Sequence, residues 1–165
     1  MSGRAWVFGD DVDTDAIAPG RYMKFSIDEI AKHVLEAVDP GFASGARPGD
    51  IVVGGRNFGA GSSREQAPAA LRHLGVSALV APSFAGLFYR NCFNVGLLAV
   101  VCAEAGRIRA GDIVELVPEA GRIYDRTTSE TLSCAAIPPH LMEMVRDGGL
   151  LPQLEKRLVR ERQLR

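Results

Sequence analysis

One short segment combines small, polar and charged residues in an order suited to binding an anion: Gly59-Ala60-Gly61-Ser62-Ser63-Arg64-Glu65. The dinucleotide-binding pattern would need a glycine where Arg64 stands, and neither the P-loop ending GK[ST] nor the hydrolase pattern GxSxG occurs in it. A helix N-terminus attracts anions, and arginine binds carboxylates and phosphates through a planar fork. The segment therefore predicts a cradle for an anionic ligand, formed by Ser62, Ser63, Arg64 and the loop amides.

The same segment also has a purely structural interpretation. Ser62 and Glu65 have the spacing of a capping box, so a helix is expected over 62–74. Its two glycines allow left-handed backbone whether or not a ligand binds. Against this interpretation, Arg64 would occupy the first turn of that helix, where a cation is unfavourable. A ligand facing Arg64 would explain its position, and both interpretations stay open on the spacing alone.

A second candidate is the acidic run from Asp10 to Asp15, which holds four carboxylates in six residues. Such a run could bind a hard cation such as Ca²⁺. The EF-hand pattern fails, because Asp15 and Arg21 occupy the positions where that loop needs glycine and glutamate. The alternative is a solvated loop whose carboxylates close local turns.

The cysteines and histidines do not complete a site of their own. Cys92, Cys102 and Cys134 lie far apart in the sequence and have apolar neighbours. They therefore predict buried thiols in a reducing compartment rather than cluster ligands or disulfides. The three histidines fall in expected helices, and no triad can be assembled from local spacing. The rest of the chemistry is expected to come from another subunit.

The elements that must position these segments follow an α/β pattern. Short apolar runs predict strands at 4–8, 50–53, 77–80 and 97–101, with helices over 26–38, 62–74 and 84–93. This alternation predicts parallel βαβ units with right-handed crossovers. Beyond Gly106 the pattern changes to β-prone runs at 112–117, 122–125 and 131–135, which predict antiparallel pairing. Two helices are expected to follow, over 140–145 and 151–164.

Length and charge restrict the class of protein. The 165 residues fit a single domain over 1–165 with a C-terminal helical tail. A net charge of −1 provides no basic field for nucleic acid or an anionic membrane surface. No stretch approaches the ~18 apolar residues of a membrane span, and no signal peptide opens the chain. These features predict a cytoplasmic protein whose main partner is neither nucleic acid nor membrane.

Four motifs together resemble the small subunits of the 3-isopropylmalate dehydratase family, in the aconitase superfamily. They occupy residues 9–22, 55–68, 81–97 and 148–152. The resemblance covers nearly the whole chain. It implies the swivelling β/β/α domain of aconitase-type hydro-lyases, similar to the aconitase C-terminal domain, with a mixed sheet and parallel βαβ units.

The resemblance also implies the roles of several residues. In the family the first serine of the GSSRE motif, here Ser62, removes a Cα proton, and its arginine, here Arg64, binds a substrate carboxylate. The Asp of the TD pair, here Asp15, lies at the same site. A large partner subunit carries a [4Fe-4S] cluster that binds the substrate hydroxyl and carboxylate, and this chain is expected to bind none. The implied reaction converts 2-isopropylmalate to 3-isopropylmalate by dehydration and rehydration in leucine biosynthesis.

This sequence departs from the usual motif GCGSSREHAP, because Ala60 and Gln66 replace the cysteine and the histidine. Neither is the proton-moving residue, so the replacements bear on the surroundings of the site. The segment 22–25 falls in the loop that resembles the family's specificity loop. There Lys24 adds a cation, which would favour a substrate with an additional carboxylate, unless it is simply a surface lysine.

Several functions remain open besides the implied one. A related hydro-lyase could act on homoaconitate, citraconate or a methylated malate, so the substrate class is a di- or tricarboxylate. A non-enzymatic anion-binding domain is the alternative from another class. The isolated chain is expected to self-associate, because its partner-facing surface would be uncovered.

Overall fold

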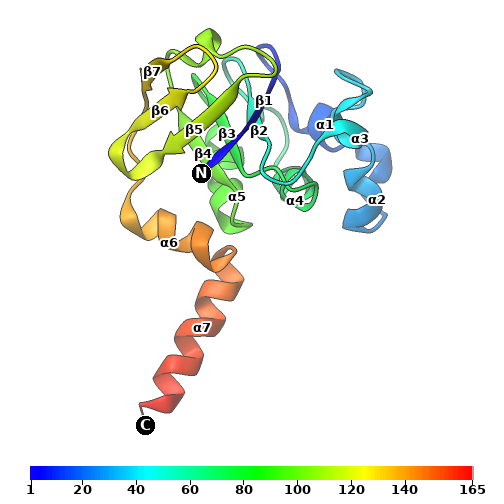
Figure 1. The fold of residues 1–165 in the computed structure, drawn as a ribbon. Coiled ribbons are helices and arrows are strands. Elements are labelled where there is room, and N and C mark those ends of the chain that lie inside the picture. Colours follow the sequence, from blue (N-terminus) through cyan, green and yellow to red (C-terminus); the bar gives the residue numbers. More distant parts are fainter. Residues whose placement is uncertain (165) are drawn as a thin grey trace.

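A seven-stranded mixed sheet forms the centre of the computed structural model, which describes residues 1–164 (Figure 1). Its strands are β1 (Ser2–Val7), β2 (Ile51–Val53), β3 (Ala78–Ala81), β4 (Leu98–Val101), β5 (Ile113–Val117), β6 (Arg122–Asp125) and β7 (Glu130–Ser133). Their order is β4-β3-β2-β1-β5-β6-β7, parallel from β4 to β1 and antiparallel from β1 to β7. The expected mixed sheet with parallel βαβ units is confirmed.

Strand β1 joins the two halves of the sheet by changing its neighbour along its length. Ser2, Gly3 and Arg4 pair antiparallel with β5, whereas the following residues from Ala5 to Val7 pair parallel with β2. Strands β2 and β3 are buried at every residue, as expected for parallel strands in the middle of a sheet. These strands contribute much of the core, which also includes Val114, Ile123 and Leu132 of the antiparallel half. The parallel half lies next to the loops that carry the candidate site.

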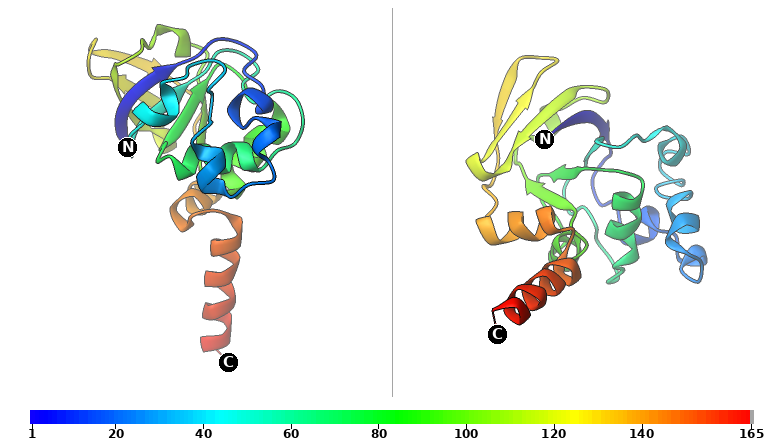
Figure 2. Two further views of the ribbon diagram at one scale, coloured as in Figure 1. Left: turned by 90° about the vertical axis from the view of Figure 1, so that its right-hand side faces the viewer. Right: turned by 60° about the horizontal axis from the view of Figure 1, so that its bottom comes forward.

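Seven α-helices accompany the sheet within residues 1–164. They are α1 (Thr14–Ile17), α2 (Ile27–Ala31), α3 (Phe42–Gly45), α4 (Gln66–His73), α5 (Gly86–Asn94), α6 (Pro139–Asp147) and α7 (Leu150–Gln163). Helices α4 and α5 form the crossovers between β2, β3 and β4. Helix α7 has no buried side chain and projects away from the rest of the chain in every view (Figures 1 and 2). In the described part of the chain, no helix has the length and apolar character to span a membrane.

The helix expected over 26–38 is much shorter in the structure. Ser26 does cap it, accepting a hydrogen bond from the Glu29 N–H at 3.4 Å, but the helix ends at Ala31. Leu35 has φ +58° and is fully buried, with its N–H 3.1 Å from the Ala16 carbonyl oxygen. A non-glycine residue adopts this conformation only at a cost. Packing of Leu35 against the chain around α1 therefore overrides the helical periodicity.

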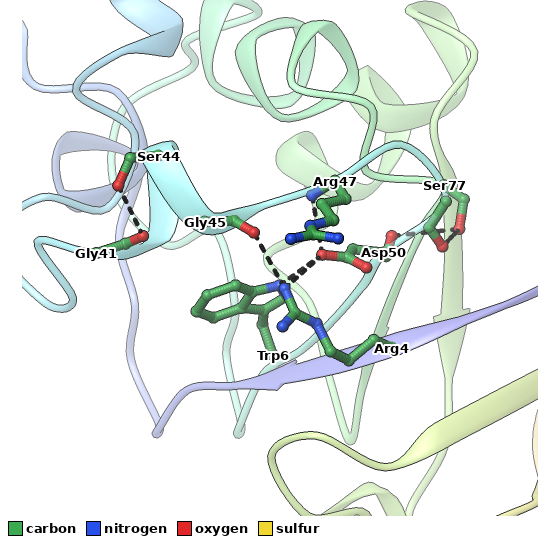
Figure 3. Close-up of polar contacts among 9 residues, drawn as sticks. Arg4, Trp6, Gly41, Ser44, Gly45, Arg47, Asp50 and Ser77 are labelled. Atoms are coloured by element: carbon green, nitrogen blue, oxygen red, sulfur yellow. Dashed lines mark hydrogen bonds and ion pairs between the residues drawn. The ribbon is translucent and has the colours of Figure 1, made fainter.

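A buried carboxylate joins the start of β2 to β1 and the end of α3 (Figure 3). Asp50 Oδ2 accepts hydrogen bonds from Trp6 Nε1 (2.8 Å), the Arg47 N–H (3.0 Å) and Arg4 Nη2 (3.2 Å). The Arg4 guanidinium also lies 4.7 Å from the centre of the Trp6 ring and donates to the Gly45 carbonyl. Burial raises the pKa of Asp50, but these hydrogen bonds outweigh it and hold the pKa below its usual value.

Candidate active site

The residues that could do chemistry gather at the carboxyl ends of the parallel strands. The chain leaving β1 runs beside the chain leaving β2, joined by bonds from Gly59 N–H to the Val12 carbonyl (2.7 Å) and from Thr14 N–H to the Ala60 carbonyl (2.8 Å). The chain leaving β3 joins them at Phe58, which bridges to the segment before α5. In open α/β sheets, ligands bind at this edge. The acidic run and the serine-rich segment are thus neighbours, although they lie far apart in the sequence.

The carboxylates of the acidic run fix the loop itself. Asp10 accepts bonds from the Arg56 N–H (2.7 Å) and Nη2 (3.0 Å), and these contacts hold the pKa of Asp10 below its usual value. Asp11 accepts from Asn57 Nδ2 at 3.0 Å, and Asp13 caps α1 at 2.7 Å. Asp13 thus closes a local turn, whereas Asp10 and Asp11 bond to residues 46 positions away, so these three carboxylates serve structural contacts. No group of three metal-binding side chains occurs within residues 1–164.

The capping-box prediction for Ser62 and Glu65 is wrong. Helix α4 begins only at Gln66, its N-cap residue makes no side-chain capping bond, and Ser62 lies in the loop before it. Gly59 and Gly61 have φ of +81° and +94°. A Cβ at Gly59 would also lie 2.1 Å from the Phe88 ring, so both the positive φ and the lack of space require glycine at this position. The left-handed turn at Gly61 keeps the following residues out of the helix.

The serine segment presents unused hydrogen-bond donors. Ser62 and Ser63 are exposed, and no backbone N–H from Gly61 to Glu65 donates to another group within residues 1–164. The eight-residue helix α4 follows at once, so its positive end lies behind these amides. Consecutive free N–H groups of this kind bind anions. The arrangement suits the anion cradle that the sequence predicts, with the donors supplied by the loop rather than by the first helical turn.

Arg64 turns back toward α1 instead of lying in a helix. Its Nη1 donates to Asp15 Oδ1 at 2.7 Å and to the Ala18 carbonyl at 3.1 Å. The same Asp15 oxygen accepts the Gly20 N–H at 3.0 Å, and the bond from Arg64 followed by that from Gly20 lowers the pKa of Asp15. The structure thus brings the predicted residues Asp15 and Arg64 together. Among residues 1–164, the Nε and Nη2 groups of Arg64 have no hydrogen-bond partner, so that edge can receive a carboxylate.

Lys24 lies in the turns that follow Gly20 and is exposed. Within the described part of the chain its side chain forms no ion pair and no hydrogen bond. Its neighbour Tyr22 stacks on His33 with ring centres 3.7 Å apart, which fixes the start of this loop. The loop is tied to the site through Gly20, whose N–H donates to the same Asp15 oxygen as Arg64.

Sequence reasoning missed two polar side chains that hold the serine loop. Thr14 is buried, and its Oγ1 donates to the Ser62 carbonyl at 2.9 Å. Asn91, on α5, places Nδ2 3.5 Å from Ser63 Oγ. For Thr14 the sequence signal is its place inside the acidic run, and Asn91 lies among other polar residues of its helix, Arg90 and Asn94, so its type does not single it out.

The cysteines of this chain do not fit an iron-sulfur cluster. Cys92 and Cys102 are fully buried and Cys134 partly so. Burial raises the pKa of all three thiols, that of Cys134 to about 11. Cluster ligation needs thiolates, which these surroundings disfavour.

Comparison with known proteins gives a consistent result. Residues 17–105 match the family described as the aconitase C-terminal domain. The 3-isopropylmalate dehydratase small subunit of Methanosarcina mazei is 47% identical, over 98% of this chain and 100% of its own. The methanogen homoaconitase small subunit of Methanothermobacter thermautotrophicus is 49% identical, over 92% of this chain and 88% of its own. A crystal structure of 3-isopropylmalate dehydratase from Methanocaldococcus jannaschii superposes with a TM-score of 0.94 at 40% identity, over 100% of this chain and 99% of that one.

Proposed function

The chain belongs to the aconitase C-terminal domain family, among the small subunits of 3-isopropylmalate dehydratases, and we propose that it supplies the proton-transferring half of a hydro-lyase site. The favoured reaction is the conversion of 2-isopropylmalate to 3-isopropylmalate in leucine biosynthesis. A large subunit completes the site and carries the [4Fe-4S] cluster of the family. The cysteines described above are consistent with that division, because their burial leaves no thiolate for iron.

In this proposal Ser62 is the base. It removes the proton from the carbon next to a substrate carboxylate, while the hydroxyl leaves the neighbouring carbon and a double bond forms between them. Water then adds back in the opposite sense, and Ser62 returns the proton to the other carbon. Arg64 binds a substrate carboxylate through its free edge, Asp15 fixes the opposite edge, and Ser63 adds a hydroxyl donor.

The observation that carries the proposal is the set of unpaired amides around an exposed serine. A serine hydroxyl is a poor base in water, because its alkoxide is unstable there. Free N–H groups from Gly61 to Glu65, with Arg64 held beside them, would stabilise that alkoxide. Such fixed donors act most strongly when water is excluded, which requires the large subunit to cover this face.

Homoaconitate is the alternative substrate with a specific observation in its favour. Lys24 is an exposed cation in the loop tied to the site through Gly20, and one of the relatives is a homoaconitase small subunit. An additional carboxylate on a tricarboxylate substrate would find a partner there. A methylated malate is supported by another relative, the isopropylmalate/citramalate isomerase small subunit of Methanocaldococcus jannaschii, because citramalate is 2-methylmalate. No described contact favours citraconate or a non-enzymatic anion-binding role.

The same proposal bears on the behaviour of the isolated chain and on its cellular compartment. Without the large subunit it self-associates, because large apolar side chains on α7 are exposed, among them Leu151, Leu154 and Leu158. The three cysteines are unpaired, which suits the reducing cytoplasm.

The test is Ser62→Ala in the complex reconstituted with the large subunit. Because Ser62 caps no helix, alanine removes the hydroxyl without a capping cost. We expect kcat to fall on the order of 10²–10⁴-fold, with the affinity for the large subunit unchanged. Ser44→Ala is the matched control, since that exposed serine bonds only to its own turn. A near-normal kcat for Ser62→Ala would place the base elsewhere.

A further inference from the structure

Thr14 stands out because its buried side chain holds the backbone of an exposed loop. Ser62 and Ser63 are exposed and their loop has few contacts of its own, whereas Thr14 is 3% exposed. All three polar groups of Thr14 are used. Its N–H donates to the Ala60 carbonyl (2.8 Å), its Oγ1 to the Ser62 carbonyl (2.9 Å), and its own carbonyl accepts the Ala18 N–H (2.9 Å).

We propose that Thr14 is a positioning residue that fixes the backbone of Ser62 in the geometry needed for proton transfer. The inference rests on the proposed role of Ser62 and extends it to a residue 48 positions away in the sequence. Thr14 itself touches no substrate in this proposal. It acts through the carbonyl of Ser62 and through that of Ala60.

The anchor is rigid because α1 is rigid. Ile17 and Ala18, three and four residues after Thr14, are fully buried, and Asp13 caps the helix by accepting the Ala16 N–H at 2.7 Å. The bond from Thr14 therefore transmits the position of a core element to the loop. The loop needs such a tie because the left-handed Gly61 next to Ser62 provides no side chain to pack.

The contacts of the neighbouring residues do not replace this bond. Arg64 is fixed through its side chain, and Asn91 reaches Ser63 only at 3.5 Å. Within residues 1–164, the bond to Thr14 is the one side-chain hydrogen bond to Ser62. Since a 1 Å misplacement can cost about 10²-fold in rate, loss of this tie should appear in kcat.

The experiment compares Thr14→Val with Thr14→Ser in the reconstituted complex. Valine keeps the shape and removes the hydroxyl, whereas serine keeps the hydroxyl and removes the methyl group. We expect Thr14→Val to lower kcat by about 10- to 100-fold with KM nearly unchanged, and Thr14→Ser to keep kcat within about threefold of the unmodified complex. A purely structural role would not give this rescue by serine or this separation of kcat from KM.

Other outcomes remain informative. If Thr14→Val does not assemble, Thr14→Cys keeps a side chain of similar size with a much weaker donor, and it should lose at least tenfold in kcat relative to Thr14→Ser. Equal kcat for the hydroxyl-bearing and hydroxyl-lacking variants would overturn the inference. If Ser62→Ala abolishes turnover while these Thr14 variants have equal kcat, then Ser62 is still the base and only the role of Thr14 is refuted. A fully active Ser62→Ala complex would instead contradict the proposed function itself.

Discussion

Removal of the Asp50 carboxylate should destabilise the chain by about 3 kcal/mol, because three donors then lose their acceptor. The bond from Trp6 Nε1 and the bond from the Arg47 N–H each join a donor to a charged acceptor, for which about 1.5–3 kcal/mol is typical. The Arg4 side chain is 41% exposed and can return to water, so its ion pair adds about 0–1 kcal/mol. The substitution also removes the cost of burying a charge, which offsets part of the stability lost with these three hydrogen bonds.

The assay is thermal unfolding followed by the fluorescence of Trp6, the single tryptophan of the chain. For a chain of this length, 1 kcal/mol corresponds to about 2–4 °C, so Asp50→Ala should lower Tm by roughly 6–12 °C. Asp50→Asn keeps one acceptor and should lose about half as much. Asp28→Asn is the control, since Asp28 is 74% exposed and its substitution should stay within about 0.5 kcal/mol.

Acid pH gives a second, independent check of the same reasoning. The pKa of Asp50 is lower in the folded chain than the value of about 3.9 expected when unfolded. Its contribution is therefore complete above about pH 4 and is lost as the pH falls below that value. The difference in stability between the unmodified chain and Asp50→Asn should narrow at acid pH. An equal difference at pH 3 and pH 7, or a loss below about 1 kcal/mol for Asp50→Ala, would refute the argument.

Three further substitutions test the site, each in the reconstituted complex with steady-state kinetics. Arg64→Lys keeps the charge but loses the planar fork, so KM should rise about tenfold or more with a smaller change in kcat. An unchanged KM would contradict the binding of a substrate carboxylate by Arg64. Asp15→Asn releases the Arg64 guanidinium and should raise KM in the same direction by a smaller factor, and a lowered KM would show that Asp15 repels the substrate. Lys24→Val should change the ratio of kcat/KM between di- and tricarboxylate substrates by roughly 10- to 150-fold, whereas a constant ratio would make Lys24 a surface residue.

The parallel pairing of β2, β3 and β4 could be predicted because its signals are local. Each of these three strands is a short apolar run, and their alternation with helices favours parallel crossovers. The same local reasoning correctly identified Ser26 as a helix cap. It also placed the glycine-containing loop 56–61 before a helix, although that helix begins at Gln66 rather than at Ser62.

Predictions from residues close in the sequence were wrong where contacts with remote residues determine the backbone conformation. The spacing of Ser62 and Glu65 predicts a cap, but Arg64 is drawn to Asp15, 49 positions away, and Ser62 to Thr14. Similarly, Leu35 leaves the helical pattern to pack next to α1. In both cases the competing partner is remote in the sequence, so no pattern within a few residues could indicate it. Thr14 was missed for the same reason.

Because the first residues of β1 pair with β5, the N-terminal end of the chain lies within the sheet, and the two ends are not equally suited to fusion with another protein. The first residues pair with β5, and Met1 bonds to Leu116, 115 positions later. During synthesis the first residues of β1 therefore have no antiparallel partner until β5 has been made. Closing so long a loop slows folding. An N-terminal fusion would begin beside the middle strands of the sheet and compete with β5 for space. A fusion after α7 would begin at the end of a helix that projects away from the sheet (Figure 2).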